Sequence, residues 1–301
     1  MKKVLGFGAA LVDLLAKVDD KWILEANVSK GGMNPVDEAT LRKLLARTEN
    51  PQVVPGGSAC NTIVGVAKLG GRASFVSKVG NDEFGELFAR HLEKCGVENR
   101  MSKSSVATGT VLSAVTPDAE RTMFTFLGAS DEFFASEIFP ELFDDVGILY
   151  LEGYRAYSEE CFETAVQMAH RIGAKTALDF GSFGVVNDCR ALFERLFADR
   201  KIDILIANED EAKAFTGLSE EAALERLSGI CEIAVVKLGA RGALIASDGE
   251  VFRVKSGRAK AVDTTGAGDL WASGFLYGMM SGYSMDRSGT LGSLVANEVV
   301  Q

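Results

Sequence analysis

The chain has 301 residues, of which 47% are hydrophobic and 25% charged, and its formal net charge is −10. This balance is typical of a globular protein and excludes an intrinsically disordered chain. The negative charge argues against nucleic acid and anionic membranes as partners, because both require a basic face. An anionic substrate would have to be met locally, by backbone amides, a few cations and a metal ion.

No C-x-x-C pair occurs among the five scattered cysteines, which are Cys60, Cys95, Cys161, Cys189 and Cys231. Their odd number and the lack of a signal-peptide pattern after Met1 favour reduced thiols in a cytoplasm. No apolar run approaches the ~18 residues that a membrane span needs. We therefore expect a cytoplasmic protein that acts on a small molecule, as a monomer or a homodimer.

A short apolar strand at 3–7 opens the chain, and residues 14–55 then mix apolar and charged side chains without a regular period. After Pro55 the pattern becomes regular. Apolar spacing predicts a helix over 59–69 and a strand over 73–79, followed by a helix over 83–95.

Two strand-like runs, 110–116 and 121–126, flank the turn residues 117–120 and predict a hairpin. From residue 147 strands and helices alternate. The expected strands are 148–151, 176–180, 202–207 and 233–238, and the expected helices are 158–172, 185–198 and 210–216.

This alternation predicts an α/β fold with a central, mostly parallel sheet flanked by helices on both faces. Two segments, about 14–55 and 105–128, do not fit the alternation. We expect them to form a small β lid over the edge of the sheet, within a single domain spanning 1–301.

The strongest motif is Asp263-Thr264-Thr265-Gly266-Ala267-Gly268-Asp269, directly before a helical pattern. A Gly-rich turn that opens a helix leaves backbone amides unpaired and presents the positive end of the helix dipole. Such a turn can hold a transferring phosphoryl group, and Asp269 in the first turn can accept a proton from an attacking hydroxyl. A capped helix start, with glycines for close packing, explains the residue types equally well.

Two further motifs are weaker on their own. Gly56 and Gly57 precede a helix in which Asn61 offers a donor and an acceptor to a polyol. Asn208 and Glu211 follow an apolar strand, where acidic residues suit an outer-shell magnesium site or a helix N-terminus equally well.

Together these motifs resemble the ribokinase-like (PfkB) family of carbohydrate and nucleoside kinases, over essentially the whole chain. Residues 263–269 are similar to the C-terminal signature of that family, and Gly56 to Asn61 with Gly80-x-Asp82-x-Phe84-Gly85 to its N-terminal signature. Asn208-x-x-Glu211 resembles its magnesium-linked motif, and Lys237-Leu238-Gly239-x-x-Gly242 its nucleotide-side turn.

The resemblance implies an ATP-dependent kinase with Asp269 as its base. The amides of Gly266, Ala267 and Gly268 would form an anion hole, and Asp13, Gly56, Gly57 and Asn61 would bind the acceptor. ATP would contact Asn208, Lys237, Gly239 and Gly242, and Glu211 would bind Mg2+ through water. Many family members also use a monovalent cation such as K+, for which Asp263 and Thr265 are the corresponding positions.

The acceptor is harder to predict. The long stretch between Asp13 and Gly56 is similar to the adenosine-kinase branch, which favours a nucleoside 5′-hydroxyl. A base would need an apolar slot, for which the candidates are Leu11, Phe124, Phe126 and Phe134. The alternatives are a free-sugar kinase of the fructokinase or ribokinase type and, in another class, a sugar-binding protein without catalytic activity.

Overall fold

The computed structural model describes residues 1–257 and 266–300. Its largest feature is a nine-stranded sheet in which neighbouring strands are parallel except at one edge, where the pairs β14–β15 and β15–β16 are antiparallel. In spatial order the strands are β16 (Glu250–Val254), β15 (Ala243–Ser247), β14 (Ile233–Lys237), β13 (Ile204–Asn208), β12 (Lys175–Asp179), β11 (Val146–Glu152), β1 (Lys3–Phe7), β5 (Ala73–Val76) and β7 (Glu98–Asn99).

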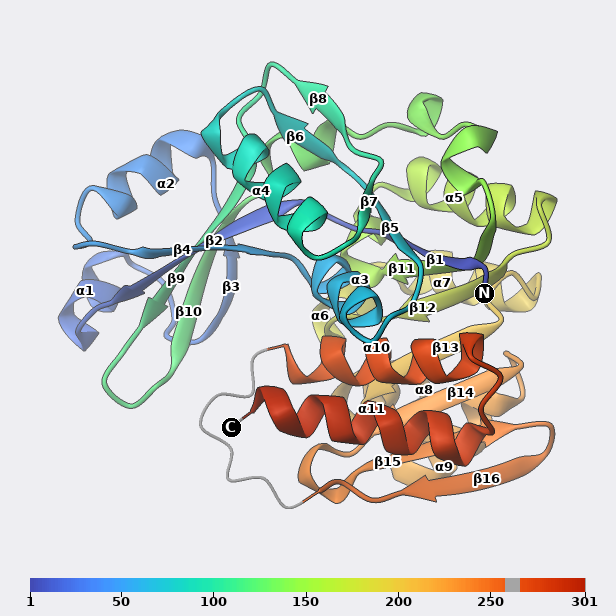
Figure 1. The fold of residues 1–301 in the computed structure, drawn as a ribbon. Coiled ribbons are helices and arrows are strands. Elements are labelled where there is room, and N and C mark those ends of the chain that lie inside the picture. The colour runs from blue at the N-terminus through green and yellow to red at the C-terminus, as the bar shows by residue number, and fades with distance from the viewer. Residues whose placement is uncertain (258–265, 301) are drawn as a thin grey trace.

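Helices cover both faces of this sheet (Figure 1). On one face, Ile63 and Phe275 pack with Val4, and on the other Phe162 packs with Leu5, as strand alternation requires. The first face holds α3 (Ser58–Lys68), α4 (Glu83–Lys94), α10 (Ala267–Met280) and α11 (Met285–Val299). The second holds α5 (Glu159–Arg171), α6 (Phe183–Asp188), α7 (Arg190–Ala198), α8 (Glu209–Thr216) and α9 (Glu220–Ser228). The predicted α/β architecture is confirmed.

A second, five-stranded sheet projects from one side of the first (Figure 1). The antiparallel pair β9–β10 is the predicted hairpin. One face packs Phe124 against Trp22 and Leu41 of two short helices, and the opposite face carries Asp13. The elements are β3 (Gly32–Pro35), β10 (Arg121–Phe126), β9 (Gly109–Val115), β2 (Leu11–Lys17) and β4 (Gln52–Gly56), with α1 (Asp20–Glu25) and α2 (Glu38–Leu45).

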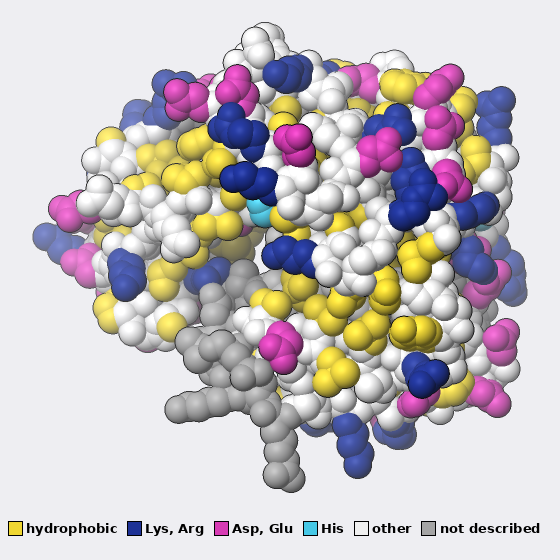
Figure 2. Space-filling view, in the orientation of Figure 1, with side chains coloured by type: hydrophobic (Ala, Val, Ile, Leu, Met, Phe, Trp, Pro, Cys, Tyr) yellow, Lys and Arg dark blue, Asp and Glu magenta, His cyan; other side chains and the backbone are white. Residues whose placement is uncertain are grey.

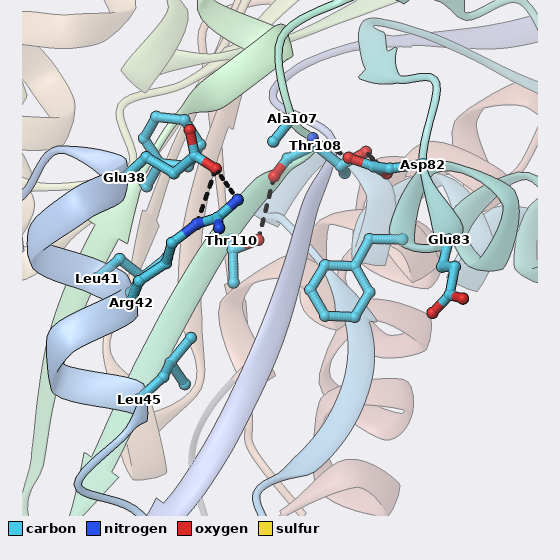
Figure 3. Close-up of a pocket in the computed structure, with 11 residues that line it drawn as sticks. Glu38, Leu41, Arg42, Leu45, Asp82, Glu83, Ala107, Thr108 and Thr110 are labelled. Atoms are coloured by element: carbon cyan, nitrogen blue, oxygen red, sulfur yellow. Dashed lines mark hydrogen bonds and ion pairs between the residues drawn. The ribbon is translucent and has the colours of Figure 1, made fainter.

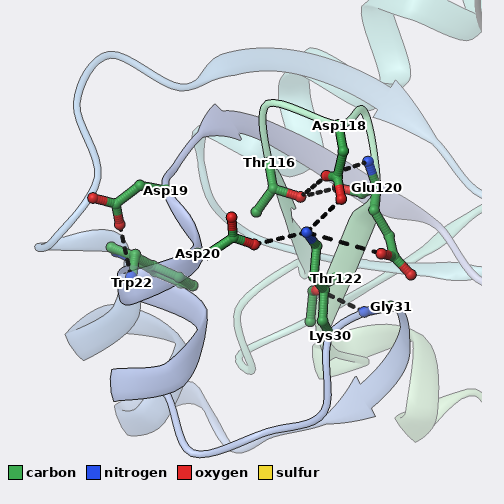
Figure 4. A network of polar contacts seen from close by, with 9 residues as sticks. All are labelled: Asp19, Asp20, Trp22, Lys30, Gly31, Thr116, Asp118, Glu120 and Thr122. Carbon is green, nitrogen blue, oxygen red and sulfur yellow. Dashed lines mark hydrogen bonds and ion pairs between the residues drawn. The ribbon is translucent and has the colours of Figure 1, made fainter.

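A polar network centred on Lys30 lies at the outer end of this sheet (Figure 4). Its ammonium donates to Asp20 at 2.7 Å and to Asp118 at 2.6 Å, and Glu120 lies 4.0 Å away. These contacts connect α1 to the β9–β10 turn. Because the carboxylates are exposed, the network contributes little to stability.

Two predicted elements are divided in the structure. The strand expected over 73–79 breaks at Ser77, whose hydroxyl accepts a hydrogen bond from the Ala10 amide at 3.0 Å. The chain then leaves the large sheet, and β6 (Lys78–Gly80) pairs with β8 (Ser102–Ser104). The helix expected over 185–198 breaks at Cys189 into α6 and α7. The buried apolar residues keep helical spacing across that break, so the pattern cannot reveal it.

The remaining elements are short 3-10 turns, namely η1 (Gly128–Glu132), η2 (Ala135–Glu137), η3 (Pro140–Phe143), η4 (Gly153–Tyr157) and η5 (Gly239–Arg241). Acidic and basic side chains are interspersed over the face shown in Figure 2, as on an ordinary solvated surface. In the part of the chain that the structure describes, no helix is both long and apolar enough to span a bilayer.

Candidate active site

Four polar side chains stand at the carboxyl ends of neighbouring parallel strands. Glu152 ends β11 and Asp179 ends β12, where the two residues pair in register. Asn208 ends β13 and Lys237 ends β14, and these two also pair in register. In open α/β sheets ligands bind at this edge, so the fold places the predicted motifs where a site is expected.

Asp269 lies in the first turn of α10, which begins after Gly266 in a left-handed conformation with φ of 74°. The Ser58 hydroxyl donates to one carboxylate oxygen at 2.7 Å, and the Asn61 amide donates to the other at 3.0 Å. The Thr62 hydroxyl donates to the Asp269 carbonyl at 3.1 Å. The N-termini of α3 and α10 are therefore held together through Asp269.

The pKa of the Asp269 carboxyl is shifted by its surroundings. Burial raises its pKa to about 6, against the hydrogen bonds from Asn61 and Ser58, which lower it. A pKa slightly below neutrality keeps the group ionised at pH 7 while leaving it basic enough to accept a proton in a transition state.

Asp13 and the two glycines of β4 and α3 meet at the junction between the sheets. Asp13 lies on β2 next to β4, directly over Gly56, where any side chain would collide with the carboxylate. Gly57 has φ of 94°, and a Cβ there would lie 2.5 Å from the Ala9 carbonyl oxygen. Position 57 therefore requires glycine, whereas a side chain at position 56 would displace the Asp13 carboxylate.

Burial raises the pKa of Asp13 to about 6, the positive charge of Arg121 lowers it, and the negative charge of Asp269 raises it. The negative charges of Asp13 and Asp269 thus repel each other across the junction. The structure brings together Asp13, Gly56, Gly57 and Asn61 beside Asp269, in an arrangement that can bind a polyhydroxylated acceptor.

A cavity of about 590 Å3 opens on the other side of the α10 N-terminus. It has the size of an ordinary small-molecule site. All four residues predicted for nucleotide contact line it, namely Asn208, Lys237, Gly239 and Gly242. Ala267 and Gly268 of the Gly-rich turn also line it, but Gly266 does not. The other lining residues are Glu209, Asp210, Ala240, Ser256, Gly257, Trp271, Ala296, Asn297 and Val300.

Glu211 forms a capping box with Asn208. Its carboxylate accepts from the Asn208 amide nitrogens at 2.8 Å, and the Glu211 backbone donates back at 2.9 Å. Burial and the nearby charge of Asp179 raise its pKa to about 7. In the described part of the chain no group of three or more His, Cys, Asp or Glu is placed to hold a metal directly.

The other two predicted cation ligands, Asp263 and Thr265, lie outside the described residues.

Three residues of the site were missed by sequence analysis. Ser58 donates to Asp269, Glu152 accepts from the Ala59 amide at 2.9 Å, and Asp179 pairs with Lys237 at 2.9 Å. Burial raises the pKa of Glu152 to about 7, while the bond from Ala59 lowers it. Glu152 and Asp179 each end an apolar parallel strand, the same signal that singled out Asn208, and could have been found in that way.

Of the four residues considered for a base slot, Leu11 lies on the same face of β2 as Asp13, whereas Phe124, Phe126 and Phe134 do not gather there. Phe124 and Phe126 pair with Leu112 and Thr110 of β9, which in turn pair with Leu14 and Val12 of β2. All of these side chains lie on the face of the sheet opposite to Asp13. Phe124 is buried in the core. Phe134, which precedes η2, is exposed, and its ring lies beside the ammonium of Lys78 in β6.

Phe126 instead borders a hollow of about 300 Å3 between α2 and α4 (Figure 3). Asp82 at its rim accepts from the Thr108 amide and hydroxyl at 2.8 and 2.6 Å, and Arg42 pairs with Glu38 on the other wall. This hollow lies behind the second sheet, on the face away from Asp13, and is separate from the candidate site.

Comparison with known proteins identifies the family. A model of the pfkB family of carbohydrate kinases matches residues 25–301. The chain belongs to the PfkB family. As a PfkB carbohydrate kinase it uses ATP, and members of the family usually require Mg2+.

Relatives within the family differ in their named acceptors. A 5-dehydro-2-deoxygluconokinase of Bacillus subtilis is 29% identical over 81% of this chain and 80% of its own length. A probable sugar kinase from Rhizobium etli is 34% identical, with a TM-score of 0.92, over 100% of this chain and 93% of that one. An adenosine kinase from Sinorhizobium meliloti is also 34% identical, with a TM-score of 0.91, over 99% of this chain and 94% of that one.

Proposed function

We propose that this PfkB kinase transfers the γ-phosphate of ATP to a hydroxyl of a free sugar or sugar acid. The observation that carries the proposal is the composition of the sheet face around Asp13. In the described strands, the side chains on the same face as Asp13 include Leu11, Leu15, Val111, Ser113, Met123 and Thr125, and no aromatic side chain is among them. A nucleobase would be bound best by stacking on an aromatic side chain on this face, whereas a small polyol needs no such partner. The relatives named 5-dehydro-2-deoxygluconokinase also support a sugar or sugar acid as the acceptor.

In this proposal the acceptor lies between Asp13 and Asp269, with Gly57 and Asn61 beside it. Asp13 accepts hydrogen bonds from acceptor hydroxyls, and Asp269 takes the proton of the attacking hydroxyl. The oxygen forms a bond to the γ-phosphorus while the bond from that phosphorus to the β–γ bridging oxygen breaks, and ADP leaves with that electron pair.

The amides of Gly266, Ala267 and Gly268 would donate to the phosphoryl oxygens. Amides in the first turn of a helix have no carbonyl partner within that helix, and the dipole there favours negative charge. Mg2+, when bound with ATP, would neutralise phosphate charge, and Glu211 would orient its waters.

An acceptor panel tests the proposal. ADP release is measured with ATP and Mg2+ against 5-dehydro-2-deoxygluconate, fructose, ribose and adenosine. We expect at least one free sugar or sugar acid to reach a kcat/KM of about 10⁴ M⁻¹s⁻¹ or more. Efficient turnover of adenosine without turnover of any sugar would reject it.

A nucleoside 5′-hydroxyl is the second candidate. The long segment before Gly56 and the 34% identity to the Sinorhizobium meliloti adenosine kinase favour it. The same panel separates the two candidates, because adenosine and the sugars are compared at equal enzyme concentration.

The pH dependence follows from the base. Asp269 must be ionised to accept a proton, and its pKa is raised to about 6. We therefore expect kcat/KM to rise tenfold per pH unit below pH 6 and to level off above it. A profile that is flat between pH 5 and 7, with the chain still folded, would contradict this assignment.

We propose that the second sheet, with the segments of about 14–55 and 105–128, acts as a lid within the single domain. Closure would keep water from the γ-phosphate. Small-angle scattering should show a smaller radius of gyration when acceptor and a non-hydrolysable ATP analogue are both present. A profile unchanged by both ligands would count against the lid.

The monovalent cation is proposed at Asp263 and Thr265. We expect K+ to stimulate turnover more than Na+ at equal ionic strength. Equal rates in the two salts would remove the cation from the proposal.

The compartment that we propose is the cytoplasm, where ATP is available and the five free cysteines would stay reduced. Activity lost under reducing conditions would argue against this compartment.

A further inference from the structure

Lys237 occupies the point where the nucleotide cavity meets the Gly-rich turn. It ends β14, and only 13% of its side chain is exposed. Its ammonium lies 3.2 Å from where a Cβ of Gly268 would stand, so glycine at 268 leaves room for it. Among the described residues that line the cavity it is the one Lys or Arg.

The surroundings of Lys237 are strongly acidic. Asp179 from β12 accepts from its ammonium at 2.9 Å, and the charges of Glu211 from α8 and Asp269 from α10 also act on it. Burial lowers the pKa of Lys237, but these carboxylates outweigh burial and raise it above its ordinary value. The side chain is therefore a buried ammonium ion.

A buried ion pair seldom adds net stability, because both charges lose their hydration. The pair of Lys237 and Asp179 stands where ATP must bring several negative charges, beside carboxylates that would repel them. A fixed cation at this place lowers that repulsion, and its effect is largest where water is excluded.

We propose that Lys237 is a further catalytic residue, whose ammonium binds an oxygen of the transferring γ-phosphoryl group, and that Asp179 is its positioning residue. This inference rests on the proposed phosphoryl transfer but not on which acceptor is used. Lys237 keeps its proton throughout, because the hydroxyl proton goes to Asp269 and the breaking bond leaves its electrons on ADP. The ammonium thus stabilises charge and takes no part in bond exchange.

Asp179 is suited to the positioning role because both of its oxygens are engaged. One accepts from Lys237, and the other accepts from the Gly181 amide at 3.1 Å. Its side chain is 5% exposed, so its geometry is set by the protein rather than by solvent. Asp179→Asn keeps the shape of this contact and removes its charge.

The first test needs no acceptor. Calorimetry measures the binding of ADP and of β,γ-methylene-ATP to the whole chain and to Lys237→Met. We expect the variant to bind the ATP analogue at least about tenfold more weakly and to bind ADP almost as well as the unaltered chain. Equal weakening for the two nucleotides, or none, would overturn the contact with the γ-phosphate.

The second test uses turnover with whichever acceptor the panel identifies. Lys237→Met should lower kcat by about 10²–10³-fold, as removal of one transition-state donor does, with a smaller change in the KM for ATP. Lys213→Met on the exposed side of α8 is the matched control and should leave kcat unchanged.

A double-variant cycle tests the role of Asp179. If Asp179 acts through Lys237, Asp179→Asn should lower kcat in the unaltered chain and have little further effect in the Lys237→Met background. Effects that multiply independently would overturn the positioning role.

The double variant also guards against misfolding, because it removes both members of the Lys237–Asp179 ion pair and leaves neither of these two charges without the other. Its thermal midpoint should exceed that of Lys237→Met alone. Normal kcat in a folded double variant would overturn the proposal, whereas failure of the acceptor panel alone would leave the nucleotide-binding test decisive.

Discussion

Asp269→Asn is expected to lower kcat by about 10²–10⁴-fold while leaving ATP binding nearly unchanged. The amide keeps the size of the carboxylate and can still contact Ser58 and Asn61, which hold the native group at 2.7 and 3.0 Å. It cannot accept the hydroxyl proton, so the loss falls on the chemical step rather than on binding. Steady-state kinetics with the best acceptor of the panel, at saturating ATP, measure the effect.

Asp286→Asn is the matched control for this change. Asp286 also lies in the first turn of a helix, α11, but it is exposed and far from the junction in sequence. Its variant should retain full activity. A kcat for Asp269→Asn within a few-fold of the unaltered chain would show that another group removes the proton.

Asp13→Ala is expected to lower kcat/KM for the acceptor by roughly 10- to 10²-fold. A hydrogen bond to a charged group contributes about 1.5–3 kcal/mol, and Asp13 stands on the open face of the second sheet beside Gly56. The change should raise KM for the acceptor and leave KM for ATP unaltered, because Asp13 does not line the cavity that we propose for ATP.

The control lies in the same sheet. Asp118→Ala removes an exposed carboxylate from the Lys30 network at the turn between β9 and β10. It should leave both KM values unchanged. If Asp13→Ala raised KM for ATP as much as KM for the acceptor, the sheet would be affecting the whole site and Asp13 would not be an acceptor ligand.

The pH expectation for the base also applies to Asp13, whose pKa is likewise raised to about 6. Each group has a folded-state pKa above its ordinary value, so protonation at low pH favours the folded chain relative to the unfolded one. Protonation of these two groups therefore causes no loss of structure as the pH falls, and the fall in activity below pH 6 should occur while the chain is still folded. Circular dichroism across the same pH range separates the two effects.

Local patterns were enough to predict the alternating part of the fold. The strands near 148, 176, 202 and 233 were located because apolar runs bounded by polar residues mark buried parallel strands. The break at Cys189 was missed because the apolar period continues through it. The end of β5 at Ser77 was missed because it depends on a partner, the Ala10 amide, 67 residues away.

The candidates for a base slot are divided for a related reason: Leu11 lies on the face of Asp13, whereas Phe124 and Phe126 lie on the opposite face, as hairpin aromatics that belong to the core do. Phe124 and Phe126 were grouped with Leu11 by their apolar character, although strand alternation already placed the two aromatics on one face. Which face turns toward Asp13 is set by the pairing of β9 with β2, a contact between segments about 100 residues apart.

Asp269 illustrates which features of the site follow from local sequence. A glycine-rich turn before a helix, with an acid in its first turn, specifies unpaired amides and a nearby carboxylate from local geometry alone. Its environment comes from elsewhere: Ser58 and Asn61 arrive from α3, 211 and 208 residues away, and burial then raises the pKa of the carboxyl to about 6. Lys237 and Asp179 show the same division, since each ends its own strand but their 2.9 Å contact exists only because β12, β13 and β14 lie side by side. Local sequence governs backbone conformation over a few residues, whereas partners, burial and electrostatics depend on the packing of distant segments.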